Sequence, residues 1–268
     1  MPAKGGIGMV ISAAELKRSF ERDGFVIFPD LFGLEEVQAL KAEILRLLEN
    51  LRQEAISAGK EPETILRSGV FVGLAARSPV FQQAVRDERL LNILEILIGS
   101  DIAFLSDKVV FKSDETDFGS PWHQDWLYWQ GSHKISIWVA LDDATPENGC
   151  LKLLPGSHKS VVLHNGDASD GYGFVHRLRP DSVDERQAVT AALKAGGAVF
   201  FHDLVLHASH PNISKRDRYA WIPTYKNAKD DDPHFSWAVA AAVVRGEGKF
   251  CSRCGKLVGA ASPYCSSS

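Results

Sequence analysis

A histidine and an aspartate, His123 and Asp125, stand two positions apart in the segment SPWHQDWLYWQGSHKISIWVALDD, which covers residues 120–143. Side chains two apart on a β-strand point to the same face. On a strand, this pair would therefore direct an imidazole and a carboxylate at one point. Two histidines and one carboxylate are the typical ligand set of non-haem Fe(II), so the pair predicts two of three iron ligands. The alternative is a tryptophan-rich core strand with a hydrogen-bonded histidine.

The second histidine has to come from a distant part of the chain, and the segment FFHDLVLHASHPNISKRDRYAW offers His202, His207 and His210. His202 and His207 are an odd number of residues apart, so on a regular strand they face opposite sides. His207 ends an apolar run, where a strand would reach the mouth of a barrel. His210 precedes a proline and is expected in a turn. The residues alone favour His207 and leave His202 as the alternative.

Arg218 lies eleven residues beyond His207 and could serve a second part of such a site. A guanidinium binds a carboxylate through two parallel hydrogen bonds. An inward-facing arginine on the next strand would suit a dicarboxylate co-substrate such as 2-oxoglutarate, whose 2-oxo acid end chelates iron. Ser209 could add a hydrogen bond to the distal carboxylate.

The elements that must position these residues are of two kinds. Up to about residue 99 the chain is mainly helical, with a capping box at residues 12–15, a short strand at 24–28, and helical stretches at 34–58 and 78–98. From about residue 100, short β-rich runs alternate with turns, interrupted by one expected helix at 183–193. The pattern predicts a mainly β jelly roll with a helical N-terminal layer packed on it.

Bulk composition narrows the class of protein. The chain has 268 residues, of which 45% are hydrophobic, and this suits one main globular unit, placed at residues 1–245. A net charge of −4 and a pI near 6.1 give no reason to expect nucleic acid or an anionic membrane surface as a partner. The apolar runs are far shorter than a membrane span, and no signal peptide is recognised. The expected location is cytoplasmic; nothing in the sequence predicts the oligomeric state.

The last residues, 246–268, are expected to form a separate cysteine-containing tail. Cys251 and Cys254 form a C-x-x-C pair, and Cys265 follows, which together resemble three quarters of a zinc ribbon. A fourth thiolate would be expected near Ser268. The tail could therefore bind zinc with a ligand from elsewhere, including a partner chain, or be a remnant without metal.

Several of these segments together resemble the phytanoyl-CoA dioxygenase family of Fe(II)- and 2-oxoglutarate-dependent oxygenases. The motifs are FERDGFVIFPDLF, WHQD, IWVALDDATPENGCLKLLPGSHK and FFHDLVLHASHPNISKRDRYAW, in the family's order, and the likeness spans roughly residues 12–226. The resemblance implies a double-stranded β-helix fold. It also implies hydroxylation by molecular oxygen, coupled to decarboxylation of 2-oxoglutarate to succinate and CO₂.

Carried over by position, His123, Asp125 and His207 match the family's iron ligands, which favours His207 over His202. Because the carboxylate ligand is Asp125 and not a small residue, no halide site opens at the iron. The resemblance therefore implies hydroxylation and not halogenation.

The co-substrate contacts follow in the same way. Arg218 matches the arginine that binds 2-oxoglutarate, and Ser209 and Trp138 match positions that commonly line its site. Lys108 stands where the family often has an uncharged residue near the co-substrate. We expect Lys108 to contact the co-substrate or an anionic substrate group, with an exposed strand lysine as the alternative.

The primary substrate is expected to be a small molecule, drawn from the acyl-CoA thioesters, amino-acid derivatives and secondary metabolites on which the family acts. Trp126 and Tyr128, directly after the ligand segment, weakly indicate a hydrophobic or ring-containing substrate, although tryptophans are more often core residues. The alternative function is a non-catalytic jelly-roll protein that binds a small molecule or metal without turnover.

Overall fold

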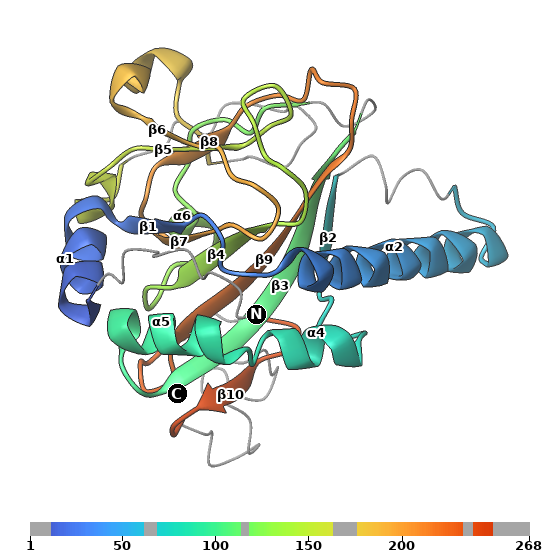
Figure 1. Cartoon of the computed structure of the whole chain (residues 1–268), viewed down its shortest axis with the longest axis horizontal. Helices are drawn as coiled ribbons and strands as arrows, with labels where there is room; N and C mark the ends of the chain where they lie inside the picture. Colours follow the sequence, from blue (N-terminus) through green and yellow to red (C-terminus); the bar gives the residue numbers. More distant parts are fainter. Residues whose placement is uncertain (1–11, 62–68, 114–117, 163–175, 233–237, 249–268) are drawn as a thin grey trace, which may run out of the picture.

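A computed structural model describes residues 12–61, 69–113, 118–162, 176–232 and 238–248 (Figure 1). Within these ranges a large antiparallel sheet stands opposite a smaller one, and helices from the N-terminal part of the chain lie beside the large sheet. The predicted mainly β jelly roll with an N-terminal helical layer is therefore confirmed.

The helices begin where the sequence supplies caps. Ser12 and Glu15 form the predicted capping box of the first helix, and Asp87 accepts the N–H of Arg89 at the start of another. That cap divides the stretch predicted as one helix over residues 78–98 into two. The helices are α1 (Ala13–Asp23), α2 (Leu34–Ser57), α4 (Pro79–Ala84), α5 (Glu88–Ile98) and the short α6 (Trp126–Trp129). Among the described residues, none of these helices is long and apolar enough to cross a membrane.

The strands of the large sheet run in the order β1-β7-β4-β9-β3-β10, with β2 paired to β3, and the small sheet has the order β6-β5-β8. Both sheets together contain β1 (Phe25–Phe28), β2 (Val70–Val72), β3 (Ile102–Lys112), β4 (Ile135–Ala140), β5 (Leu151–Leu153), β6 (Val189–Ala191), β7 (Ala198–His202), β8 (His207–Ser209), β9 (Arg218–Asn227) and β10 (Ala242–Arg245). The chain thus passes from the large sheet to the small one between β7 and β8.

Residue alternation along the strands separates two cores. In β4, Ile137 and Val139 belong to the core shared with α2 and α5, whereas Trp138 belongs to the core between the two sheets. The same alternation applies at the end of β9, where Tyr219 packs toward the helices. Its neighbour Arg218 consequently faces the space between the sheets, where the functional side chains gather.

The helix predicted over residues 183–193 is wrong. The segment forms one 3₁₀ turn, Glu185–Gln187, and then strand β6, in which Val189 pairs with Leu153 and Ala191 with Leu151. The apolar residues Val189, Ala191 and Leu193 recur at every second position, which is the period of a strand and not of a helix. The partner strand β5 therefore decided the local structure.

Candidate metal and co-substrate site

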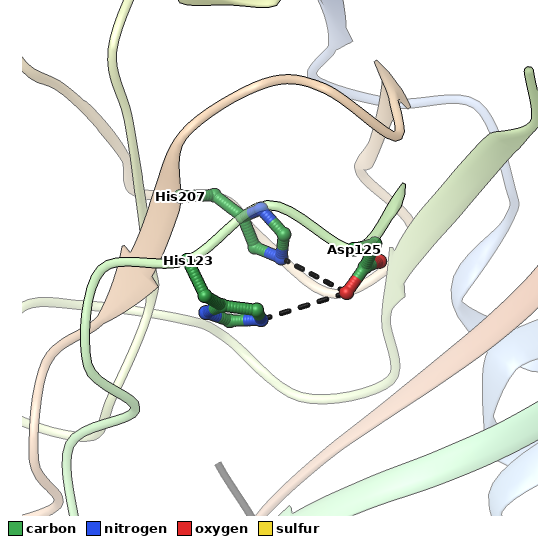
Figure 2. Close-up of side chains that lie close together, drawn as sticks. All are labelled: His123, Asp125 and His207. Atoms are coloured by element: carbon green, nitrogen blue, oxygen red, sulfur yellow. Dashed lines mark ion pairs between the residues drawn. The ribbon is translucent and has the colours of Figure 1, made fainter. Parts of the chain in front are cut away.

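The side chains of His123 and Asp125 point toward that of His207, which is distant in the sequence, in the space between the sheets (Figure 2). The Nε2 atoms of His123 and His207 lie 3.5 and 3.8 Å from Oδ1 of Asp125. All three residues are buried. Two imidazole nitrogens and one carboxylate oxygen at these separations can bind one metal ion from one side.

His123 and Asp125 do not lie on the regular strand that their spacing predicted. His123 forms an isolated antiparallel bridge with His207, with both N–H to O=C hydrogen bonds at 3.0 Å. Asp125 instead has helical angles, φ −63° and ψ −32°, and immediately precedes α6. Gln124 between them points away and donates to the carbonyl oxygens of Leu204 and Ser160. The convergence of the pair thus depends on a bridge followed by a turn.

Hydrogen bonds on the far side of each imidazole orient it for metal binding. The Nδ1 atom of His123 lies 2.8 Å from the carbonyl oxygen of Pro121, and Nδ1 of His207 lies 2.9 Å from that of Val205. A carbonyl can only accept, so we assign the ring proton to Nδ1 in both histidines. Each Nε2 then presents a lone pair toward Asp125, which is the state that a metal ion requires.

The electrostatics of the cluster favour the same protonation states. Burial, together with the neighbouring imidazole of His123, lowers the pKa of His207 to about 4, so the His207 ring is neutral at pH 7. Burial alone would raise the pKa of Asp125, but the positive charge of Lys108 and the neighbouring imidazoles hold that pKa far below its ordinary value. His207 thus supplies a neutral imidazole and Asp125 a carboxylate, both of which are donors that non-haem Fe(II) takes.

A cavity of about 110 Å³ adjoins these three residues and extends to Arg218 at the start of β9. The Arg218 side chain is buried, and its guanidinium lies over the ring of Trp138, 5.3 Å from the ring centre. Its Nε atom has no hydrogen-bond partner, and no described carboxylate forms an ion pair with it. Burial lowers the pKa of Arg218 to about 10, so the group is still a cation at pH 7. Apart from one long hydrogen bond, 3.5 Å, to the carbonyl oxygen of Val110, the guanidinium has no hydrogen bond within the described part of the chain, and a buried cation of this kind at a cavity wall is suited to an anionic ligand.

A second buried cation at this end of the cavity, Lys112, was not singled out by the sequence. It lies on β3 directly opposite Arg218 on β9, and its ammonium donates to Ser209 Oγ at 2.9 Å and to the Phe118 carbonyl oxygen at 2.6 Å. Ser209 Oγ is in turn hydrogen-bonded to the backbone N–H and the hydroxyl of Ser120. The sequence signal for Lys112 would have been its four-residue spacing from Lys108, which places both lysines on one face of the strand.

The other predicted contacts divide into those that line the cavity and those that do not. Lys108, Trp138 and Ser209 all line it. Trp126 and Tyr128 do not: the indole of Trp126 donates to the carbonyl oxygen of Gly131, and the hydroxyl of Tyr128 to that of His176. The proposed substrate contacts of these two aromatic residues stay a prediction.

Of the alternative histidines, His202 ends β7 and lies with His133 and Asp203, apart from the cavity. His210 also does not line the cavity. The three cysteines of the tail, Cys251, Cys254 and Cys265, lie outside the described residues, and the zinc prediction is not tested.

Comparison with known sequences places these features in a family. The sequence model described as phytanoyl-CoA dioxygenase (PhyH) matches residues 20–220. An ectoine dioxygenase from Stutzerimonas stutzeri is 31% identical over 229 residues, covering 77% of this chain and 74% of the relative. An L-proline trans-4-hydroxylase from Streptomyces griseoviridis is 28% identical over 255 residues, covering 84% and 91%.

Solved structures agree with the fold. The apo form of the non-heme monooxygenase ThoJ superposes with a TM-score of 0.68 at 24% identity, covering 91% of this chain and 89% of that one. EvdO2 from Micromonospora carbonacea var. aurantiaca, in complex with 2-oxoglutarate, gives 0.60 at 25% identity, covering 84% and 93%. With the family match covering most of the chain, the protein belongs to the phytanoyl-CoA dioxygenase family and is a 2-oxoglutarate-dependent dioxygenase.

Proposed function

We propose that this enzyme hydroxylates an aliphatic C–H bond of a small molecule, with 2-oxoglutarate and molecular oxygen as co-substrates and succinate and CO₂ as co-products. One oxygen atom would enter succinate and the other the new hydroxyl group. The observation that carries the proposal is the joint presence, in one cavity, of the His123–Asp125–His207 donor set and the buried guanidinium of Arg218, whose Nε has no hydrogen-bond partner.

Each residue has a defined task in this proposal. His123, Asp125 and His207 hold Fe(II), which supplies the redox chemistry that activates oxygen. The Arg218 guanidinium binds the distal carboxylate of 2-oxoglutarate, and Ser209 donates a hydrogen bond to it. Trp138 supports the guanidinium through the contact described above. Fixing the co-substrate at its distal end orients its 2-oxo acid end toward the metal.

Lys108 extends the positive wall of the cavity toward the metal ligands, because its charge acts on both Asp125 and His207. We propose Lys108 as a further contact to an anionic group of the co-substrate or of the primary substrate. Asp125 also bears on the type of reaction. A carboxylate ligand leaves no place for a halide, which supports hydroxylation over halogenation.

The relatives support a small substrate. One relative is named for an amino acid, L-proline, and another for ectoine. We therefore propose a small polar metabolite, such as an amino acid or its derivative, ahead of a long-chain acyl thioester.

Succinate formation from 2-oxoglutarate by anaerobically Fe(II)-loaded protein, after exposure to oxygen, tests the proposal. We expect slow succinate formation without primary substrate, and its loss in His207→Ala and Arg218→Ala. His210→Ala is a matched control, because His210 lies three residues from His207 but does not line the cavity.

Calorimetric titration of 2-oxoglutarate into metal-loaded protein separates the other outcomes. Binding without turnover would mean that the primary substrate is required for oxygen activation. Absence of both metal-dependent binding and succinate would contradict the assignment of these residues.

A further inference from the structure

A hydrogen-bond network centred on Lys112 joins the two sheets at the end of the cavity that holds Arg218. Lys112 is 1% exposed, and its amino group donates to Ser209 Oγ at 2.9 Å, to the carbonyl oxygen of Phe118 at 2.6 Å and to that of His210. Three acceptors require three hydrogens, which only the ammonium form carries. Because these three contacts engage all three hydrogens, Lys112 can bond directly to a ligand only by giving one of them up, although it lines the cavity.

Ser209 receives two hydrogen bonds in this network. Its Oγ accepts from the Lys112 ammonium and, at 3.0 Å, from the backbone N–H of Ser120. A hydroxyl oxygen has two lone pairs and one hydrogen, so both acceptor positions of Ser209 are filled and its hydroxyl can only donate. The hydroxyl oxygen of Ser120, 2.6 Å away, is then the acceptor of that hydrogen in this arrangement.

The Ser209 hydroxyl lies at the cavity wall on which a distal carboxylate is proposed to bind. Ser209, Ser120 and Arg218 all line this cavity. Arg218 lies directly opposite Lys112 in the pairing of β9 with β3, whereas Ser209 ends β8 on the facing sheet. A carboxylate only accepts hydrogen bonds, and a bond to an ionised acceptor is roughly twice as strong as one between neutral groups. A carboxylate is therefore a better acceptor for the Ser209 hydrogen than the Ser120 hydroxyl.

The stem of Lys112 is closely confined. A Cβ at Gly149 would lie 2.5 Å from Cδ of Lys112 and 3.0 Å from the carbonyl oxygen of His210, one of the acceptors of the ammonium. The glycine thus leaves the space through which the lysine stem passes. This confinement keeps the ammonium beside Ser209.

We propose that Lys112 is a positioning residue for the co-substrate, which holds the Ser209 hydroxyl as an obligate donor to the distal carboxylate of 2-oxoglutarate. On binding, the carboxylate replaces the Ser120 hydroxyl as the acceptor of the Ser209 hydrogen. Lys112 thus acts through Ser209 and not by contact with the ligand. This role rests on the proposed function, in which Arg218 binds the same carboxylate.

A double-mutant cycle of Lys112→Met and Ser209→Ala tests this role, with calorimetric titration of 2-oxoglutarate into the Co²⁺-loaded full chain. A hydrogen bond to a charged group contributes about ten-fold or more in affinity, so each single variant should bind about ten-fold more weakly. In the Ser209→Ala background, Lys112→Met should add less than about three-fold, because the hydroxyl that it orients is gone. Lys152→Met, on β5 and outside the cavity lining, is the control and should leave the Kd unchanged.

The affinity for Co²⁺ separates positioning from a structural role. Ser209 and His207 lie on the same short strand, so a general loosening of β8 by Lys112→Met would also weaken metal binding. We expect the Co²⁺ affinity to stay within about three-fold of the native value. Ser120→Ala keeps the backbone N–H that Ser209 accepts, so it should bind 2-oxoglutarate at least as tightly as the native chain. This small replacement tests the direction of the hydrogen bonds even if Lys112→Met does not fold.

Three results would overturn the role of Lys112. An equal loss from Lys112→Met in both backgrounds would show that it acts by charge alone, and weaker Co²⁺ binding would show that it only supports the strand. A Ser120→Ala variant as weak as Ser209→Ala would make Ser120 the donor. Arg218→Met separates this role from the proposed function. Weak binding in Arg218→Met with native affinity in Lys112→Met overturns the positioning role alone, whereas native affinity in both overturns the proposed placement of 2-oxoglutarate as well.

Discussion

Replacing Arg218 by methionine should weaken 2-oxoglutarate binding and at the same time stabilise the protein without ligand. Both effects follow from one feature, a buried guanidinium whose Nε has no partner and which forms no ion pair with a described carboxylate. Methionine keeps an unbranched apolar stem but has no guanidinium, so it removes the cation and retains the packing of the stem.

The size of each effect can be worked out. Burial lowers the pKa of Arg218 from 12.5 to about 10, and at about 1.4 kcal/mol per pKa unit this costs the folded state about 3 kcal/mol. Because burial disfavours the protonated form, the cost is present at every pH below about 10. The variant should therefore gain up to about 3 kcal/mol of unfolding free energy at pH 7. Loss of a buried charge pair with the ligand costs about 2–5 kcal/mol, or about 30-fold to several thousand-fold in Kd.

Two measurements on the same samples check this. Urea unfolding of metal-free protein gives the stability, and calorimetric titration of 2-oxoglutarate into Co²⁺-loaded protein gives the affinity without turnover. Arg216→Met is the matched control, because Arg216 is exposed and two residues away. It should change both quantities little.

The reasoning would be refuted by either of two results. An affinity for 2-oxoglutarate within three-fold of the native value would show that Arg218 does not bind the co-substrate. A variant about 2 kcal/mol less stable than the native protein would show that the cation is already compensated by the fold.

Three further predictions concern the framework. Burial raises the pKa of Asp107 to about 6, so its contribution to stability is complete below about pH 4 and is lost as pH rises through 6. The unfolding free energy of the native protein minus that of Asp107→Asn should fall by up to about 3 kcal/mol between pH 4 and 7, and a constant difference would contradict this. Asp232→Asn breaks the fully buried ion pair between Lys134 Nζ and Asp232 Oδ2, 2.6 Å apart, and should lower the free energy of unfolding in urea by about 3–5 kcal/mol. At the exposed neighbour, Asp231→Asn should lower it by less than about 0.5 kcal/mol. Equal losses in the two variants would argue against the ion pair. Gly149→Ala places a Cβ 2.5 Å from Cδ of Lys112 at a φ of +97°, so we expect at least about 1 kcal/mol of destabilisation and about ten-fold weaker 2-oxoglutarate binding by calorimetry. Unchanged values for both would show that Lys112 can move freely.

Sequence alone was sufficient for the family, the fold class and the identity of the candidate ligands. Those conclusions depend on short motifs and on the two-residue alternation of strands, both of which are local properties of the chain. The inward direction of Arg218 and Trp138 also follows from alternation once their strands are recognised.

Other features depend on contacts between distant segments, which local patterns do not encode. The preference for His207 over His202 by geometry needs the turn after β7 and the bridge to His123. The strand at residues 189–191 exists because β5 pairs with it, although its neighbours resembled a helix.

Contacts between polar side chains of distant segments depend most strongly on tertiary structure. Lys112 meets Ser209 across the space between two sheets, and His133 meets Asp203 across 70 residues of chain. The sequence determined which side chains carry the chemistry. The packing of two sheets decided which of them meet, because burial and pairing energies arise only when distant strands come together.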